Sequence, residues 1–218
     1  MGEQIDYTSN IDAEKLLLSV NSGDKLSDVE LERVAHAIEQ ISAISNEQQK
    51  NMLLDDLYSL ILVIGRARAM GYKSLLEKQL YSKDAFVIAL VLEIMCLEWG
   101  FIEDYLEQII SFAVGMSWDE ENDLQLMAVK ILGEYLAQIR NNDDGSRKLG
   151  IEWKKLIAQQ LHDIFNNEQH EQWVRQGAYY ALCRAGGKSW ADLPGECAVI
   201  DLKPNSPDID WELIESLL

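Results

Sequence analysis

Hydrophobic residues recur along most of this chain at the three- and four-residue spacing of amphipathic helices. The segment from Glu171 to Leu182 has the sequence EQWVRQGAYYAL, and Val174, Ala178 and Ala181 fall on the same helical face as Leu182. Alanine side chains are small, so this face can accept the close approach of another backbone. The pattern therefore predicts a helix with one tightly packed face.

Two further copies of this pattern lie upstream. One starts at Glu121, and a weaker one starts at Ser82. The equivalent positions in these copies are also apolar: Leu124, Ala128, Ile131 and Leu132 in the first, and Ala85, Ala89 and Leu92 in the second. The starts of the three copies are 39 and 50 residues apart. Repeats of about 40–47 residues that contain helix pairs are the signature of an α-solenoid.

The repeated segment resembles the first helix of a HEAT repeat, D-x-x-V-R-x-x-A-x-x-A-L-G. Glu171 stands where that family usually has Asp, and Arg175 matches its Arg. In the Glu121 copy, Gln125 replaces the Arg and Gly133 matches the final Gly. The resemblance covers residues 82–186. It implies stacked helix pairs that provide a binding surface rather than an active site, which is an argument from fold analogy.

The rest of the chain follows the same helical period. Ser27 is expected to cap a helix through a capping box with Glu30, and Asp84 is expected to cap the most hydrophobic helix. The buried stripe of the Ser27 helix is predicted to be Val29, Val34, Ala37, Ile38, Ile41 and Ile44. Other helices are predicted over residues 11–20, 46–70, 74–80, 85–97, 101–114, 122–140, 148–166 and 210–218.

We expect an all-α fold in one domain, residues 1–218, arranged as a short HEAT-like α-solenoid. Residues 1–80 supply N-terminal helices, residues 82–186 supply the repeats, and residues 187–218 form an irregular C-terminal cap. All three prolines lie in this tail. Within it, residues 197–202 are either one short strand or an extended segment.

Net charge limits the choice of partner. The chain carries 37 acidic and 19 basic residues, a net charge of −18. Phosphates need Lys and Arg to replace their counterions, so nucleic acid and anionic membranes are disfavoured. A basic protein is favoured because complementary potentials speed association. The plainer interpretation is that the acidity only maintains solubility.

Cysteines and the N-terminus suggest a cytoplasmic protein. Cys96, Cys183 and Cys197 form no C-x-x-C pair, and their odd number argues against a disulfide framework. The first residues contain neither a basic region nor an apolar run, so no signal peptide is expected. The apolar run at 85–97 is too short to span a bilayer and includes Glu93.

No motif indicates catalysis, a cofactor or a metal. His36, His162 and His170 lie outside known metal-binding patterns. The Gly187-Lys188-Ser189 triplet lacks the earlier glycine and the preceding strand of a phosphate-binding loop. The alternating acids from Asp119 to Asp123 lack the glycine and glutamate that an EF-hand needs. We therefore expect no catalytic residue, no cofactor and no metal ligand.

Acidic and aromatic residues remain as candidates for partner binding. Trp118 is followed by acids, which predicts an aromatic anchor surrounded by negative charge, and we expect Trp99 on the same side. A helix face rich in acids is a second candidate. The predicted partner-binding residues are Trp99, Glu103, Asp104, Glu107, Trp118, Asp119, Glu120, Glu121 and Asp123. The alternatives are core tryptophans and an ordinary solvated helix face.

Three hypotheses for function follow. The leading one is an inhibitory binding protein similar in charge, size and helical form to bacterial immunity proteins, which would occlude a basic toxin domain such as a nuclease. The second is a scaffold or adaptor that binds a helix or peptide in an apolar groove with charge only at its rim. The third is an enzyme with an unrecognised site. A monomer and a homodimer are both compatible with the sequence.

Overall fold

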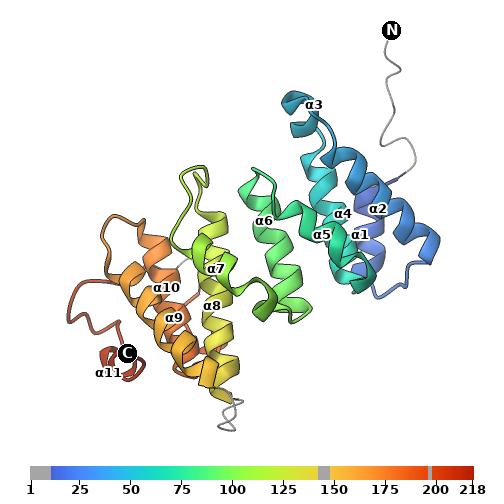
Figure 1. The fold of residues 1–218 in the computed structure, drawn as a ribbon. Coiled ribbons are helices and arrows are strands. Elements are labelled where there is room, and N and C mark those ends of the chain that lie inside the picture. Colours follow the sequence, from blue (N-terminus) through green and yellow to red (C-terminus); the bar gives the residue numbers. More distant parts are fainter. Residues whose placement is uncertain (1–10, 142–147, 196–197) are drawn as a thin grey trace. The chain divides into compact units, whose positions relative to one another are not determined.

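The computed structural model describes residues 11–141, 148–195 and 198–218, and its regular structure over those residues is entirely helical (Figure 1). The all-α class predicted from the sequence is confirmed. The chain divides into two compact units, Met1–Phe101 and Ile102–Leu218. The Ser82 copy of the repeated segment belongs to the first unit, and the other two copies belong to the second.

The first unit contains six α-helices and two other helical segments among its described residues. They are α1 (Ala13–Asn21), α2 (Asp28–Ser42), α3 (Glu47–Asn51), α4 (Leu54–Arg66), the 3₁₀ segment η1 (Met70–Tyr72), α5 (Lys73–Gln79), α6 (Ala85–Leu92) and the π-helical segment η2 (Glu93–Glu98). The predicted capping box is present, because Ser27 and Glu30 bind each other's backbone N–H groups. Val29, in the first turn of α2, is exposed, so its predicted burial is wrong.

One predicted helix of this unit is two helices in the structure. Residues 46–70 were expected to be continuous, but α3 ends at Asn51 and α4 begins at Leu54. Asp55 and Asp56 lie in the first turn of α4, where acidic side chains favour a new helix start. The helix then ends at Arg66, because Arg68 adopts a left-handed φ of 50°.

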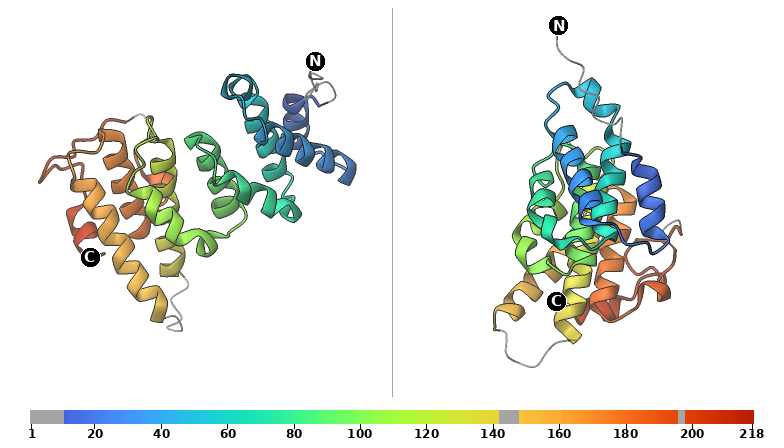
Figure 2. Two further views of the ribbon diagram at one scale, coloured as in Figure 1. Left: turned by 45° about the horizontal axis from the view of Figure 1, so that its top comes forward. Right: turned by 90° about the vertical axis from the view of Figure 1, so that its right-hand side faces the viewer.

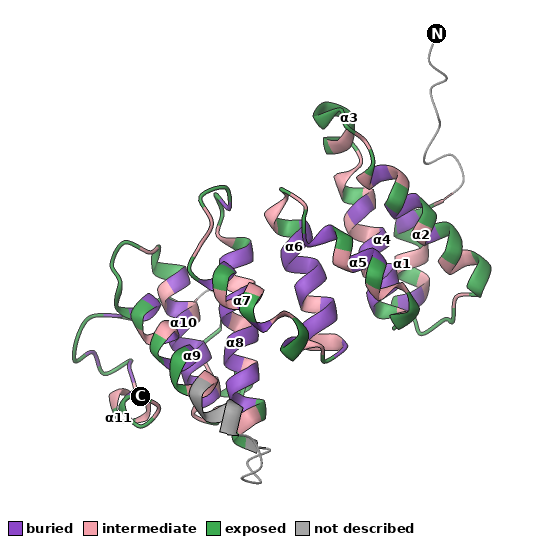
Figure 3. Cartoon of the chain, viewed as in Figure 1, coloured by how far each residue is buried: buried purple, intermediate pink, exposed green. Residues whose placement is uncertain are grey.

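The most hydrophobic segment lies in the core of the first unit. Helix α6 and η2 are buried on almost every side, as Figure 3 shows. Gly65 of α4 permits this packing, since an added Cβ would lie 2.7 Å from Ile94 Cδ1. Gly100, with φ of 83°, then ends the segment.

The second unit contains five α-helices and two 3₁₀ segments among its described residues: η3 (Ile102–Tyr105), α7 (Leu106–Ala113), α8 (Asp123–Asn141), α9 (Lys148–Asn166), α10 (Gln172–Ala185), η4 (Trp190–Asp192) and α11 (Trp211–Glu215). Helix α7 packs against α8, and α9 packs against α10, while α8 and α10 lie side by side (Figures 1 and 2). Gln160 of α9 donates a 2.9 Å hydrogen bond to the Ile110 carbonyl of α7. The four helices therefore form two layers, α7 with α9 and α8 with α10.

The C-terminal tail lies against α9 and α10. The Tyr179 hydroxyl donates to the Asp208 carbonyl and accepts from the Asp210 amide, both at 3.1 Å. Trp211 stacks obliquely on Phe165, with ring centroids 5.7 Å apart. Residues 198–202 form no regular secondary structure, and Cys197 lies outside the described residues.

No helix within the described ranges combines the length and the hydrophobicity needed to cross a lipid bilayer.

Candidate functional site

Two of the predicted partner-binding residues are buried. Trp99 is only 7% exposed, and its indole N–H points to the Gly65 carbonyl at 3.4 Å within the first unit. Asp119 is 5% exposed, and its Oδ2 accepts the backbone N–H of Gln125 at 2.9 Å. Both side chains act in packing and helix capping, so neither offers surface to a partner, and the prediction is corrected for these two residues.

The other predicted residues are on the surface of the second unit. Trp118 is 38% exposed. The remaining exposed acids fall into two groups: Glu103, Asp104 and Glu107 on η3 and α7, and Glu120, Glu121 and Asp123 at the start of α8. Asp123 also lines a cavity, and this distinguishes it from the other candidates.

The apolar positions of the repeated segment face the core. Leu124, Ala128, Ile131 and Leu132 of α8 and Val174, Ala178, Ala181 and Leu182 of α10 are each fully buried. The segment forms α8 and α10, each of which packs against the helix that precedes it in the chain. A Cβ added at Gly133 would lie 2.7 Å from the Ala181 Cα, so small residues bring the two helices together here.

The same position in the two copies performs the same task with different side chains. Gln125 Nε2 donates to the Ala113 carbonyl at the end of α7, at 2.9 Å. Arg175 Nε donates to the Phe165 carbonyl near the end of α9, also at 2.9 Å. Carbonyls at a helix C-terminus have no partner within the helix, so each side chain caps the helix that precedes its own.

Helices α8 and α10 run parallel. An added Cβ at Gly177 would lie 3.0 Å from Leu126 Cδ2, Gly133 meets Ala181, and further along Arg184 binds Glu134. The residue numbers of the contacting positions increase in the same direction along both helices. The N-termini of α8 and α10 therefore lie at the same end of the unit.

An apolar groove lies between these helices on their solvent side. Its volume is about 570 Å³. The two helices contribute residues at the same three-, four- and seven-residue spacing, and the loop after α10 forms the remaining wall. The groove is lined by Asp123, Leu126, Met127 and Lys130 of α8, by Trp173, Gln176, Gly177 and Tyr180 of α10, and by Trp190, Leu193, Pro194 and Gly195 of the loop.

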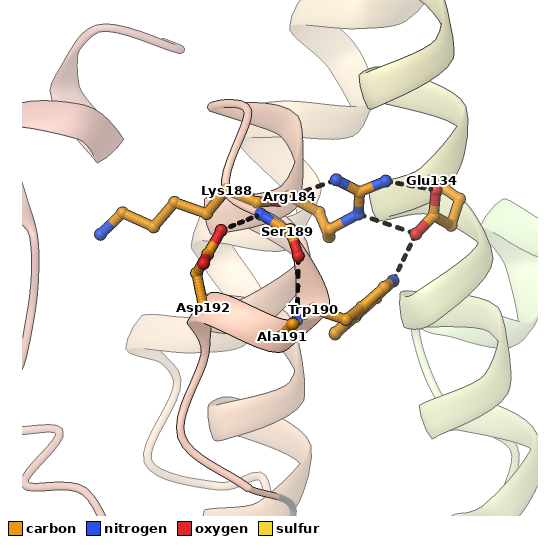
Figure 4. Close-up of polar contacts among 7 residues, drawn as sticks. All are labelled: Glu134, Arg184, Lys188, Ser189, Trp190, Ala191 and Asp192. Atoms are coloured by element: carbon orange, nitrogen blue, oxygen red, sulfur yellow. Dashed lines mark hydrogen bonds and ion pairs between the residues drawn. The ribbon is translucent and has the colours of Figure 1, made fainter.

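Glu134 holds the loop wall in place (Figure 4). Its two carboxylate oxygens accept from Arg184 Nε at 2.8 Å and Nη2 at 3.0 Å, and the Trp190 indole N–H also donates to Oε1. Ser189 and Asp192 form a capping box at the turn that carries Trp190. The wall of the groove is therefore tied to both α8 and α10.

Electrostatics keep the Glu134 carboxylate ionised. Burial by itself raises its pKa, but the hydrogen bonds from Arg184 and Trp190 and the charges of Arg184 and Lys130 together hold the pKa below its usual value. The ionised carboxylate is the form that can accept all three of these N–H groups. The ionised Glu134 carboxylate thus holds the loop wall in position, and the hydrogen bond from Trp190 in the loop wall in turn favours ionisation of Glu134.

Most of the groove residues were not predicted from the sequence. Trp173 is 49% exposed and Trp190 is 38% exposed, although both are large and aromatic. Trp173 occupies one of the unspecified positions of the repeated segment, on the side away from the buried face. The tryptophan at this position was the signal in the sequence, because tryptophan is enriched at protein interfaces.

The described residues hold no group of three or more His, Cys, Asp or Glu side chains that is suited to bind a metal ion. His162 and His170 lie apart from the groove lining. Cys96 and Cys183 are buried, and burial raises the pKa of the Cys183 thiol.

Comparison with known proteins did not identify a family. No protein-family model matches the chain, and no curated protein or solved structure was found to be similar to it.

Proposed function

We propose that this protein is a protein-binding module that holds an apolar segment of a basic partner protein in the groove between α8 and α10. The observation that carries the proposal is the groove itself, which half-exposed Trp173 lines together with Met127 and Tyr180. Trp and Tyr concentrate binding energy at protein interfaces, and methionine adapts to varied partners.

Charge supports the choice of a basic partner. The chain carries a net charge of −18, Asp123 lines the groove, and the exposed acids Glu120 and Glu121 precede it in the chain. An apolar groove with charge at its rim is the arrangement expected of a scaffold or adaptor. Binding in this form needs no catalytic group.

We further propose that α7–α8 and α9–α10 are two successive units of a HEAT-like α-solenoid. The parallel course of α8 and α10 supports this, as do the matched capping roles of Gln125 and Arg175. A crystal structure in which α7–α8 superimposes on α9–α10 with residue 125 on residue 175 would support the proposal. A different register would contradict it.

Photo-crosslinking in cells tests the binding function. A photoreactive amino acid at position 127 or 173 should crosslink to a basic polypeptide, whereas the same group at exposed Val29 in the first unit should not. Adding Trp173→Ala to the position-127 variant should reduce the yield at least tenfold, because an aromatic anchor typically contributes about 2 kcal/mol. Adding the matched control Trp118→Ala should leave it unchanged. Equal yields from groove and control positions would contradict the proposal.

A toxin-neutralising inhibitor is the second candidate. The exposed acids of η3 and α7, together with those before α8, favour it, because a basic nuclease cleft binds phosphates and is blocked by carboxylates. In that case binding depends on Glu103, Asp104, Glu107, Glu120 and Glu121 rather than on the groove. Loss of crosslinking on reversing these charges, with no effect of Trp173→Ala, would favour the inhibitor.

A further inference from the structure

Charged side chains are distributed unevenly along the groove. Because α8 and α10 run parallel, Glu120, Glu121, Asp123 and Glu171 all lie at its N-terminal end, and each is exposed. One turn or more further along, Lys130 lines the groove. Beyond it the Glu134 carboxylate is paired with Arg184, and the exposed Asp192 carboxylate accepts the Ser189 backbone N–H.

The apolar part of the groove is short. On α8 it extends from residue 123 to residue 130, which corresponds to roughly 10 Å along the helix axis. This length, with a volume of about 570 Å³, suits a few bulky side chains of a partner rather than a long segment. Trp173, Tyr180 and Trp190 supply flat apolar surfaces for those side chains.

We infer that the occupant is a partner segment in which a short block of bulky apolar residues is followed, on one side only, by a block of Lys or Arg. The apolar block fills the groove beside Met127 and Trp173, and the basic block extends over Glu120, Glu121 and Asp123. Basic residues at the opposite end would meet Lys130, and Glu134 is there already paired with Arg184, so they would gain less than beside the four exposed acids at the N-terminal end. This inference rests on the proposed groove function and specifies the partner for it.

Peptides of equal length and composition test the inference. In the first, tryptophan and leucine residues form one block and lysines form the next. In the second, the same residues are interleaved. Titration of the labelled peptides with the full chain, followed by fluorescence anisotropy, should show that the block peptide binds about tenfold more tightly at low salt. The preference should shrink as salt is added, because rim charges are screened.

Two triple variants with the same change in charge test which acids cause the preference for the block peptide. Glu120→Gln, Glu121→Gln and Asp123→Asn together should abolish the preference for the block peptide. Glu103→Gln, Asp104→Asn and Glu107→Gln together should leave it intact. All six carboxylates are exposed, and circular dichroism checks that both variants fold.

Three results would overturn the inference: equal affinity of the two peptides, no binding of either, or a preference that depends on the control triple instead. The proposed function is judged separately, because crosslinking from positions 127 and 173 requires no assumption about the partner's sequence.

Discussion

Helices α8 and α10 are two copies of the repeated segment. Their equivalent residues are similar on one face and different on the other. On the inward face, equivalent positions hold similar residues, such as Ala128 and Ala178 or Leu132 and Leu182. On the groove face, equivalent positions are unlike: Asp123 corresponds to Trp173, and Lys130 corresponds to Tyr180. The repetition is thus confined to the surfaces that pack.

This difference shows how the two faces are constrained. A buried position must fit its neighbours at near-crystalline density, so the same geometry in two copies selects similar side chains. A position that faces solvent has no such constraint and can differ between copies. The groove is formed where two unlike faces of like helices meet.

The largest expected effect concerns the inward face. Gly133→Leu places a side chain where even a Cβ would lie 2.7 Å from the Ala181 Cα. Because backbone cannot yield as a flexible side chain does, we expect a loss of about 3 kcal/mol in the free energy of unfolding. Chemical denaturation measures it. Gly71→Ala is the control, since no atom lies within 4 Å of a Cβ there. Equal stability of the two variants would show that α8 and α10 do not pack through Gly133.

The capping side chains come next. Gln125→Leu removes the donor to the buried Ala113 carbonyl, and leaving that acceptor unpaired should cost about 2 kcal/mol. Arg175→Leu should cost less, because Arg175 is only half-buried and water can reach the Phe165 carbonyl more easily. Gln138→Leu, at an exposed position of α8, is the control. A larger effect for Arg175 than for Gln125 would contradict the equivalence of their roles.

Acidification should weaken the second unit by a smaller amount. Burial, with the charge of Arg175, lowers the pKa of His170 from 6.5, so the folded state favours the neutral ring. This contribution is complete above pH 6.5 and is lost as the pH falls through the lowered pKa. Glu134, whose pKa is also lowered, adds a second loss below pH 4.5. Denaturation midpoints at a series of pH values should fall in these two windows. His170→Gln should reduce the dependence of the midpoint on pH in the first window. If that dependence is unchanged by the substitution, His170 is excluded as its source.

The smallest expected effect on stability is at the groove face. Trp173→Ala should change the free energy of unfolding by less than about 1 kcal/mol, because its side chain is half exposed and lies outside the core. Thermal denaturation of this variant beside Trp118→Ala provides the comparison. A large loss for Trp173 alone would assign it to packing and weaken its proposed role as an anchor.

Local signals in the sequence predicted much of the secondary structure. The capping box at Ser27 and the cap at Asp84 were both predicted and both occur. The break at Met52 was missed because no proline or glycine marks it. Trp99 and Asp119 were named as partner-binding residues although both are buried, with a core position as the alternative for the tryptophan. A tryptophan beside acids has the same local pattern whether it faces a partner or the core.

The sequence alone determined the helices, the inward face of each repeated segment and the acidity of the chain. These follow from periodicity and composition, which are local properties. Only the tertiary structure decided that α8 and α10 run parallel, that their solvent faces form one groove, and that Glu134 ties the loop wall to both helices. Each of these depends on residues about fifty positions apart meeting in space, and no local pattern records which solvent-facing positions will become neighbours.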